Sequence, residues 1–350
     1  MKALTLAPKT IRSSPKAGRP QLCVTSTAAL ALVLYVILNA VFYPVARAFP
    51  DSNGTTRVVA AFRSPENVPE IVILGSSVAK HVYGAIPKVD VQRRKISNLS
   101  FNLQVVSDGF ILSDKLLIGP KQPKLVVLCV CPRDFIDHDI KDVTRTTTFR
   151  KIVTLADFPR LASVLDLSFF DCARAAYSNL CCFYDERAAV QEHLKARTVA
   201  AYKWLGTACQ QKPEVEDLWT HSLREYAWRY EGISTTKLAP QMSTLRQTVE
   251  LCKSRGMKVV LVNLPMSRDN LDLLPIGFYT DFCGRLKQLS SEGDCQFIDC
   301  GSSKQIAKVD FVDCAHLNSE GGQKVFAMLR PTFDELSNRN ISAWPQSAEK

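Results

Sequence analysis

The sequence predicts a doubly wound α/β protein, in which parallel strands alternate with helices. An unbroken run of β-branched and aliphatic residues, such as Ile71–Leu74, is typical of a strand buried on both faces. Helical patterns of apolar residues separate such runs, as expected for a sheet covered on both sides. We expect strands near 70–74, 95–99, 124–130, 258–262 and 296–298, and helices over 104–118, 241–255, 278–292 and 318–336.

A long segment, residues 140–238, interrupts this alternation. Its pattern is largely helical, and it holds three of the four tryptophans, Trp204, Trp219 and Trp228. We interpret it as a helical insertion between the third and fourth strands. A separately folding domain is the alternative.

The N-terminal region carries an apolar stretch that is long enough to cross a membrane. No charged residue occurs from Pro20 to Ala46, and about 20 apolar residues are needed to span the hydrocarbon core. The alternatives are a buried core helix and a cleavable signal peptide that ends near Ala48. We predict an uncleaved transmembrane signal anchor over residues 21–46.

The distribution of charge predicts the orientation of this anchor. The net charge is +10, and five basic residues precede the span, whereas Arg47 alone follows it closely. The positive-inside rule therefore places the N-terminus in the cytoplasm and the rest of the chain outside, as a single-pass membrane protein. No basic patch stands out within the folded region, so nucleic acid is not an expected partner.

The cysteine content fits an exported domain. Eleven of the twelve cysteines follow the apolar stretch, and disulfides persist in extracellular compartments. We expect at least one disulfide among them, with buried free thiols as the alternative. The spacings lack a paired C-x-x-C zinc signature, and no metal or other cofactor is predicted.

These observations divide the chain by composition and pattern. The predicted segments are a cytoplasmic tail at 1–20, the anchor at 21–46, a linker at 47–68, an α/β domain formed by 69–139 and 239–337, the helical insertion at 140–238, and a tail at 338–350.

A candidate nucleophile follows the first predicted strand. Gly75-Ser76-Ser77 leads from that strand into a helix, and function in open α/β sheets gathers at the carboxyl ends of strands. The helix N-terminus would favour an anionic group there. The alternative is a simple strand-to-helix turn. The segment lacks the G-x-S-x-G and phosphate-loop patterns.

A candidate base lies near the end of the domain. Asp313 and His316 are three residues apart before the last predicted helix. A serine nucleophile needs a base, and the base needs a group that orients it. The alternative is an N-capping turn with an incidental histidine.

Together these two sites resemble the SGNH, or GDSL-like, hydrolase superfamily. Its first block is a strand followed by G-[DSN]-S, matched by residues 75–77, and its last block is D-x-x-H, matched by Asp313 and His316. The resemblance covers about residues 70–135 and 240–335. It implies a flavodoxin-like three-layer α/β/α sandwich with a Ser77, His316 and Asp313 triad.

The resemblance is closest to a membrane-anchored branch, which includes D-alanyl transfer proteins of teichoic acid and O-acetylation proteins of alginate-type polysaccharides. It implies an extracytoplasmic esterase or O-acyltransferase that acts on an acylated glycan or lipid of the cell envelope. A membrane-bound O-acyltransferase is then a candidate partner. The alternative is a non-catalytic scaffold that keeps the fold to bind a glycan or such a partner.

The groups that would stabilise the oxyanion depart from the superfamily pattern. Its second-block glycine has no clear counterpart, and Asn98 and Asn102 are the nearest candidates. Its third-block asparagine is absent, because Cys131–Asp134 replaces G-x-N-D. Arg133 and Asn263 are candidate substitutes.

Each substitute has a structural alternative. Arg133 could form an ion pair with Asp134, and Asn263 could cap the end of a strand. His81, four residues beyond Ser77 on the same predicted helix face, could contact substrate or lie on the helix surface.

Overall fold

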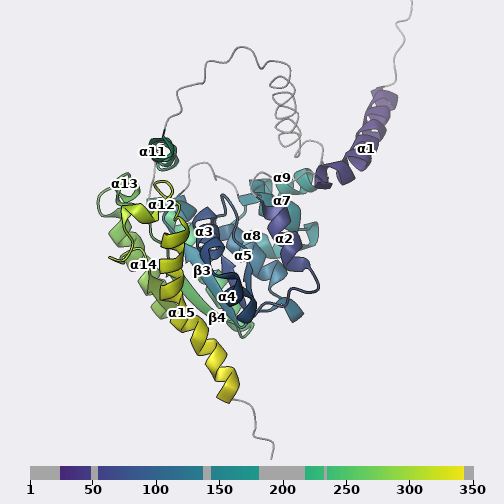
Figure 1. Ribbon diagram of the computed structural model, residues 1–350. Coiled ribbons are helices and arrows are strands. Elements are labelled where there is room, and N and C mark those ends of the chain that lie inside the picture. The colour runs from purple at the N-terminus through teal and green to yellow at the C-terminus, as the bar shows by residue number, and fades with distance from the viewer. Residues whose placement is uncertain (1–23, 49–53, 137–142, 181–216, 232–234, 343–350) are drawn as a thin grey trace, which may run out of the picture.

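Five parallel strands form a sheet at the centre of the molecule (Figure 1). The computed structural model describes residues 24–48, 54–136, 143–180, 217–231 and 235–342. The strands are β1 Ile71–Leu74, β2 Ile96–Asn98, β3 Leu125–Val130, β4 Lys258–Asn263 and β5 Gln296–Asp299. They lie where the apolar runs predicted them.

The strand order is β2-β1-β3-β4-β5, which is the flavodoxin-like order of a doubly wound sheet. Ile71 pairs with Ile96 on one side and with Leu125 on the other, so β1 is an internal strand. The order reverses between β1 and β3, and ligands bind such sheets outside the carboxyl ends of the strands at this point. The turn that follows β1 is therefore in the position that the fold favours for a site.

Helices precede, connect and follow the strands. They are α1 Val24–Ala48, α2 Thr55–Arg63, α3 Ser77–Ala85, α4 Lys88–Arg93, α5 Val106–Leu116, α6 Arg133–Ile136, α7 Thr147–Ile152, α8 Phe158–Val164, α9 Phe169–Leu180, α11 Leu218–Arg229, α12 Thr235–Ser254, α13 Arg268–Leu271, α14 Phe278–Glu292 and α15 Ser319–Ser342. Short 3₁₀ turns are η1 Gly119–Lys121, η2 Val143–Arg145, η3 Leu155–Asp157 and η4 Lys308–Asp310.

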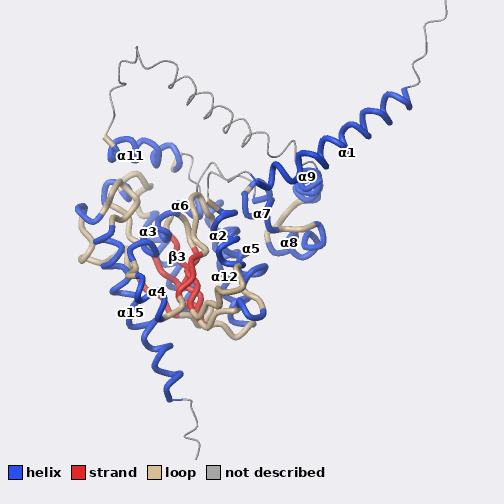
Figure 2. Tube along the Cα trace, turned by 45° about the vertical axis from the view of Figure 1, so that its right-hand side comes forward, coloured by secondary structure: helices blue, strands red, loops and turns tan. Residues whose placement is uncertain are grey.

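Two helical layers enclose the sheet. Helices α3 and α15 pack together on one face, and α5 and α12 pack together on the other (Figure 2). All six residues of β3 are buried between the layers. The structure thus confirms an α/β fold with a parallel sheet between layers of helices.

Helix α1 extends away from this body in both views (Figures 1 and 2). Of the anchor predicted at 21–46, residues 21–23 lie outside the described residues, and the side chains of 29–41 are the ones described. Among the described residues, no helix combines the length and the hydropathy that a membrane span requires.

The segment predicted as a linker at 47–68 contains a helix. Residues 49–53 lie outside the described part, but α2 begins at Thr55, and its Val59 and Phe62 are buried in the core. The three-residue spacing of these two side chains places them on one face of the helix. This apolar face, which the sequence analysis overlooked, holds the segment against the domain.

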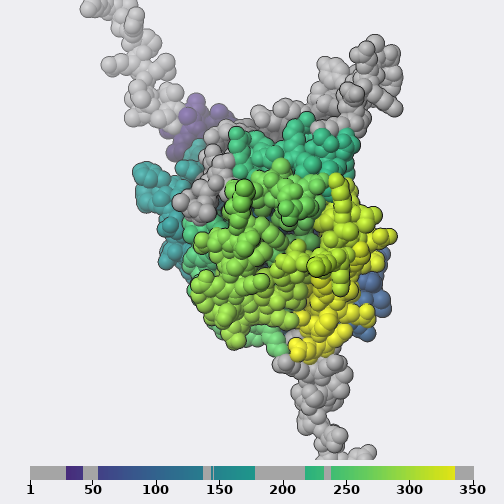
Figure 3. All heavy atoms as spheres, turned by 90° about the vertical axis from the view of Figure 1, so that its left-hand side faces the viewer, coloured from purple at the N-terminus to yellow at the C-terminus, as the bar shows by residue number. Residues whose placement is uncertain are grey.

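The predicted insertion at 140–238 is helical in its described parts. Its helices are α7, α8, α9 and α11, while residues 181–216, with Trp204, lie outside the described residues. Helix α11 lies over the upper edge of the domain and contacts α13 (Figure 3). The insertion therefore reaches the edge at which the candidate site lies.

The eight described cysteines of the predicted exported domain are all free, and most of them are buried. The expected disulfide is therefore wrong for these eight, and Cys181, Cys182 and Cys209 lie outside the described residues. The physical reason is that cysteine packs as a small apolar side chain in a core such as this. In the same described ranges, no cluster of three His, Cys, Asp or Glu side chains could hold a metal ion.

Candidate active site

The turn after β1 presents Ser77 at the first position of a helix. Strand β1 ends at Leu74, Ser76 is the N-cap of α3, and Ser77 begins α3. The backbone N–H groups in the first turn of a helix have no partner within the helix, so this end carries a partial positive charge. Ser77 is therefore held in a field that favours an oxygen anion beside it.

Gly75 fixes the position of this turn against the sheet. Its φ is +153°, and a β-carbon built there would lie 2.5 Å from the Cys129 carbonyl oxygen and 2.6 Å from the Ala79 β-carbon. With its amide oriented to satisfy both ends, Gln104 donates to the carbonyl oxygens of Gly75 (2.5 Å) and Leu99 (3.1 Å). Only glycine allows so close an approach of β1 to β3.

The second half of the site is a closed turn before α15. The Asp313 Oδ1 accepts hydrogen bonds from the backbone N–H groups of Ala315 (2.9 Å) and His316 (2.8 Å). Phe311 and Leu317 form an isolated antiparallel bridge, and the Val312 N–H donates to the His316 carbonyl (2.8 Å). The chain thus folds back on itself, which sets the direction of the His316 side chain.

These two halves meet at the carboxyl edge of the sheet. The distance from His316 Nε2 to Ser77 Oγ is 2.8 Å, and His316 Nδ1 lies 2.8 Å from Asp313 Oδ2. An ionised carboxylate only accepts hydrogen bonds, so Nδ1 carries the proton, and Nε2 of a neutral imidazole is left to accept from the serine hydroxyl. This is the arrangement that a serine nucleophile and its base require.

Asp313 is suited to hold the imidazole. Burial alone would raise the pKa of Asp313. The hydrogen bond from His316, the charge of the His316 imidazole and the two backbone N–H donors outweigh burial and lower this pKa below its ordinary value. Asp313 therefore remains ionised at neutral pH and can stabilise a protonated His316.

Side chains from two other segments hold the residue between Asp313 and His316. The Ser222 Oγ of α11 accepts a hydrogen bond from the Cys314 N–H (3.0 Å), and the Ser267 Oγ donates to the Cys314 carbonyl (2.6 Å). The Asn270 amide also donates to the Cys314 sulfur (3.2 Å). The helical insertion thus contributes directly to the position of the turn. These three residues could not be identified from the sequence, because a polar residue beside a helix N-terminus or on a helix carries no signal for such a long-range contact.

Replacing Ser222 tests the contribution of its hydrogen bond with the Cys314 N–H. Ser222→Ala leaves the buried Cys314 N–H without its acceptor, so we expect the free energy of unfolding to fall by about 1–3 kcal/mol. Guanidinium unfolding of the full-length protein in detergent measures this change. Ser291→Ala, an exposed serine on α14, is the control and should leave the stability near that of the wild type. Equal stabilities of the two variants would show that α11 does not support the turn.

Of the oxyanion candidates after β2, Asn102 lies beside the helix of Ser77. Its Oδ1 accepts a hydrogen bond from Lys80 Nζ (3.2 Å), one turn along α3. Its amide NH₂ group has no hydrogen-bond partner within the described ranges. Asn98 instead closes its own loop, with its Oδ1 accepting from the Ser100 N–H (2.9 Å) and its Nδ2 donating to the Ser100 carbonyl (3.1 Å).

The other two oxyanion candidates, Arg133 and Asn263, make the ion pair and the strand-end cap that were the alternatives to an oxyanion role. Arg133 is 2% exposed; its guanidinium donates to the Gln104 carbonyl (3.3 Å) and contacts the Asp134 carboxylate (3.5 Å). Asn263 is fully buried at the end of β4, where its amide donates to Asp299 on β5 (2.8 Å) and to the Tyr279 hydroxyl (2.9 Å). Ion pairing and strand capping therefore engage both side chains in contacts with residues other than Ser77.

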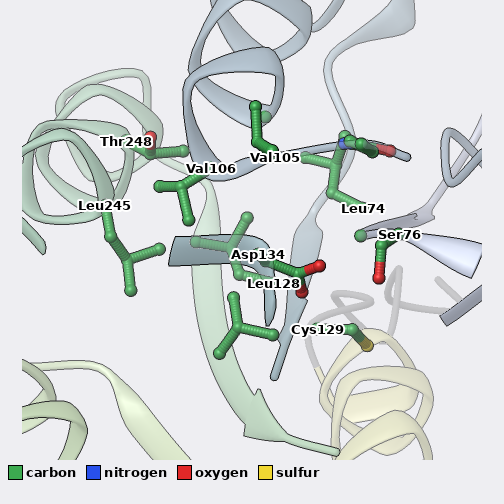
Figure 4. A pocket seen from close by; sticks show the side chains of 13 residues that line it. Leu74, Ser76, Val105, Val106, Leu128, Cys129, Asp134, Leu245 and Thr248 are labelled. Carbon is green, nitrogen blue, oxygen red and sulfur yellow. The ribbon is translucent and has the colours of Figure 1, made fainter. Parts of the chain in front are cut away.

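A largely apolar cavity lies behind the nucleophile turn (Figure 4). Gly75 and Ser76 form one part of its lining, and Val106 of α5 and Leu245 of α12 form another. The carboxylate of Asp134 lies on the Ser76 side of this cavity in Figure 4 and accepts a hydrogen bond from the Cys131 N–H (3.0 Å). The loop after β3 is thus tied to its own backbone next to the Ser77 turn.

Comparison with known proteins finds a structural match of low similarity. No family model matches the chain, and no curated protein does either. Among solved structures, the chain is similar to a "putative acylhydrolase" from Bacteroides fragilis, with 12% identity and a TM-score of 0.45. The match covers 82% of this chain and 98% of the other. At this level of similarity, the chemistry has to be inferred from the residues of this chain.

Proposed function

We propose that the protein is a serine esterase or O-acyltransferase. The observation that carries this proposal is the continuous hydrogen-bonded series from Asp313 through His316 to Ser77. It joins a hydroxyl, a base and an orienting carboxylate at the edge of the sheet that the fold favours for ligands. The match of residues 75–77 and of Asp313 and His316 to the SGNH blocks supports the same chemistry.

In the proposed reaction, the Ser77 oxygen attacks the carbonyl carbon of an acyl ester while its proton passes to His316 Nε2. The bond from that carbon to the leaving oxygen then breaks, and this oxygen takes the proton from His316. The result is an acyl group on Ser77 and a free alcohol. Water or a sugar hydroxyl then gives its proton to His316 and takes the acyl group, and His316 returns this proton to the Ser77 oxygen, which restores the serine and the neutral base.

The negative charge that forms on the carbonyl oxygen needs nearby donors. We assign this role to the backbone N–H of Ser77, at the start of α3, and to the amide of Asn102, which Lys80 holds beside that helix. Because the loss of one such donor costs about 2.7–4 kcal/mol of barrier, Asn102 is the side chain on which the rate depends most among the oxyanion candidates.

The substrate class follows from the resemblance to the membrane-anchored branch. We propose an acylated glycan or lipid of the cell envelope as substrate and a membrane-bound O-acyltransferase as partner. A direct test uses the full-length protein in detergent with p-nitrophenyl acetate, alone and with an oligosaccharide acceptor. Release of p-nitrophenolate supports the esterase, and acetylated oligosaccharide in the mass spectrum supports the transferase. If the wild-type protein formed neither product, the esterase and the transferase would both be contradicted.

A second candidate function is a non-catalytic scaffold that binds the glycan. The engagement of Arg133 and Asn263 in other contacts favours it, because it leaves the oxyanion site with fewer donors than the superfamily pattern. Calorimetric binding of an acetylated oligosaccharide without any turnover would select the scaffold.

We also propose that residues 21–46 anchor the protein and that the α/β domain lies outside the cytoplasm. The charge asymmetry around the apolar stretch motivates this topology. Protease added to intact cells or spheroplasts should remove a C-terminal tag and spare an N-terminal one. A protected C-terminal tag together with a cleaved N-terminal tag would show that the orientation is the opposite of the one proposed.

A further inference from the structure

His81 lies one helical turn beyond Ser77 and contacts the second half of the site. Its Nδ1 is 2.9 Å from the carbonyl oxygen of Leu317, the residue after His316. A carbonyl oxygen only accepts hydrogen bonds, so this contact requires the proton on Nδ1. Two residues four apart on α3 thus bond to two consecutive residues of the other segment: Ser77 to His316, and His81 to Leu317.

The two imidazole rings also lie against each other. Their centroids are 4.9 Å apart, and their planes are inclined by 35°. Desolvation against the turn, followed by the proximity of His316, lowers the pKa of His81 below its ordinary value. His81 is therefore uncharged at neutral pH, and it can stack beside His316 without repelling the proton that His316 takes up.

The backbone around this pair leaves little room for another arrangement. A β-carbon at Gly322, in the first turns of α15, would lie 2.4 Å from the Ala85 β-carbon and 3.3 Å from the His81 carbonyl oxygen. Helices α3 and α15 are therefore in close contact just beyond the site. The His81 ring bridges the remaining distance between α3 and the turn that precedes α15.

We propose that His81 is a positioning residue, whose Nδ1–H bond to Leu317 holds the His316 turn against α3 and keeps Nε2 within reach of the Ser77 hydroxyl. This inference rests on the proposed function of the site for its effect on rate, although the hydrogen bond itself does not. His81 is otherwise exposed, and we assign it no role in proton transfer or in substrate binding, so its effect is expected in the rate of attack by Ser77 and not in substrate affinity.

Two variants separate the hydrogen bond from the ring. His81→Phe keeps an aromatic ring beside His316 but loses the donor, whereas His81→Asn loses the ring and retains a donor at the position of Nδ1. With a fluorophosphonate probe, we expect His81→Phe to label Ser77 about 10- to 100-fold more slowly, as misplacement of a reacting group does. His81→Asn should stay near the wild-type rate. In ester hydrolysis the loss should appear in kcat, with KM unchanged.

A role in stability alone would lower the melting temperature of the Phe variant without a selective loss of labelling in the folded fraction. Labelling of a folded His81→Phe variant at the wild-type rate would overturn the proposal. A second measurement applies even where that variant does not fold: long-range ¹H–¹⁵N spectra of the full-length wild type, labelled at its five histidines. The His81 signals, identified as those missing in His81→Asn, should report the Nδ1–H tautomer.

The Nε2–H tautomer at His81 would contradict the hydrogen bond to Leu317 and with it the proposal. The failure of the wild-type protein to label at all would instead contradict the proposed function, and the tautomer would still decide whether the contact between α3 and the His316 turn exists.

Discussion

Ser77→Ala is expected to abolish ester turnover by the full-length protein, and His316→Ala to reduce kcat by about 10⁴-fold or more. The first change removes the oxygen that attacks the acyl carbon, and the second removes the acceptor of its proton, 2.8 Å away. Stopped-flow hydrolysis of p-nitrophenyl acetate measures both. Each residue is partly exposed at the edge of the sheet, so circular dichroism spectra and melting temperatures should remain near those of the wild type.

Matched controls distinguish the triad from general effects of substitution. Ser291→Ala on α14 and His221→Ala on α11 change the same residue types at exposed positions, and both should keep the wild-type rate. Turnover that survives in Ser77→Ala would show that another group attacks the ester. An equal loss in the controls would point to instability and not to chemistry.

Gly75→Ala is expected to destabilise the protein by on the order of 3 kcal/mol, because it combines a positive φ with overpacking. The new methyl group would meet the Cys129 carbonyl oxygen at 2.5 Å, and this atom belongs to the backbone of a central strand that cannot move alone. The β1–α3 turn must then shift, which moves Ser77 relative to His316. The free energy of unfolding, measured with denaturant, and the labelling rate of Ser77 should therefore both fall.

For Gly84→Ala, in the helix that follows this turn, we expect the opposite effect on stability. Nothing lies within 4 Å of a β-carbon there, and alanine is the better helix former, so a gain of about 0.5–1 kcal/mol is expected. If both variants changed stability to the same extent, the close approach at Gly75 would not be what fixes the turn.

The sheet could be predicted from the sequence because its strands carry the signal of burial on both faces. Ile71–Leu74 and Leu125–Val130 are entirely apolar, and both are buried throughout. Their alternation with helical patterns was sufficient to predict a parallel doubly wound sheet. The local sequence at 75–77 and 313–316 also indicated two turns, since glycine, serine and aspartate favour such positions.

What the sequence could not give were contacts between segments far apart in the chain. Arg133 and Asn263 were candidates for the oxyanion site because each follows a strand, but their contacts with the Gln104 carbonyl and with Asp299 are decided by the packing of the loops and of β5. Ser222 and Cys314 are 92 residues apart, and neither has a local pattern that predicts their hydrogen bond. The face of His81 that meets Leu317 depends on the same long-range packing.

The most direct test of the proposed chemistry is to map the site of a covalent adduct. The full-length wild-type protein is incubated with a fluorophosphonate, digested, and analysed by tandem mass spectrometry. The hydrogen-bonded series from Asp313 to Ser77 predicts one phosphonylated peptide, modified at Ser77, and the loss of this adduct in His316→Ala. An adduct at any other serine, or at Ser77 with equal yield in His316→Ala, would contradict the assignment of Ser77 as a nucleophile activated by His316.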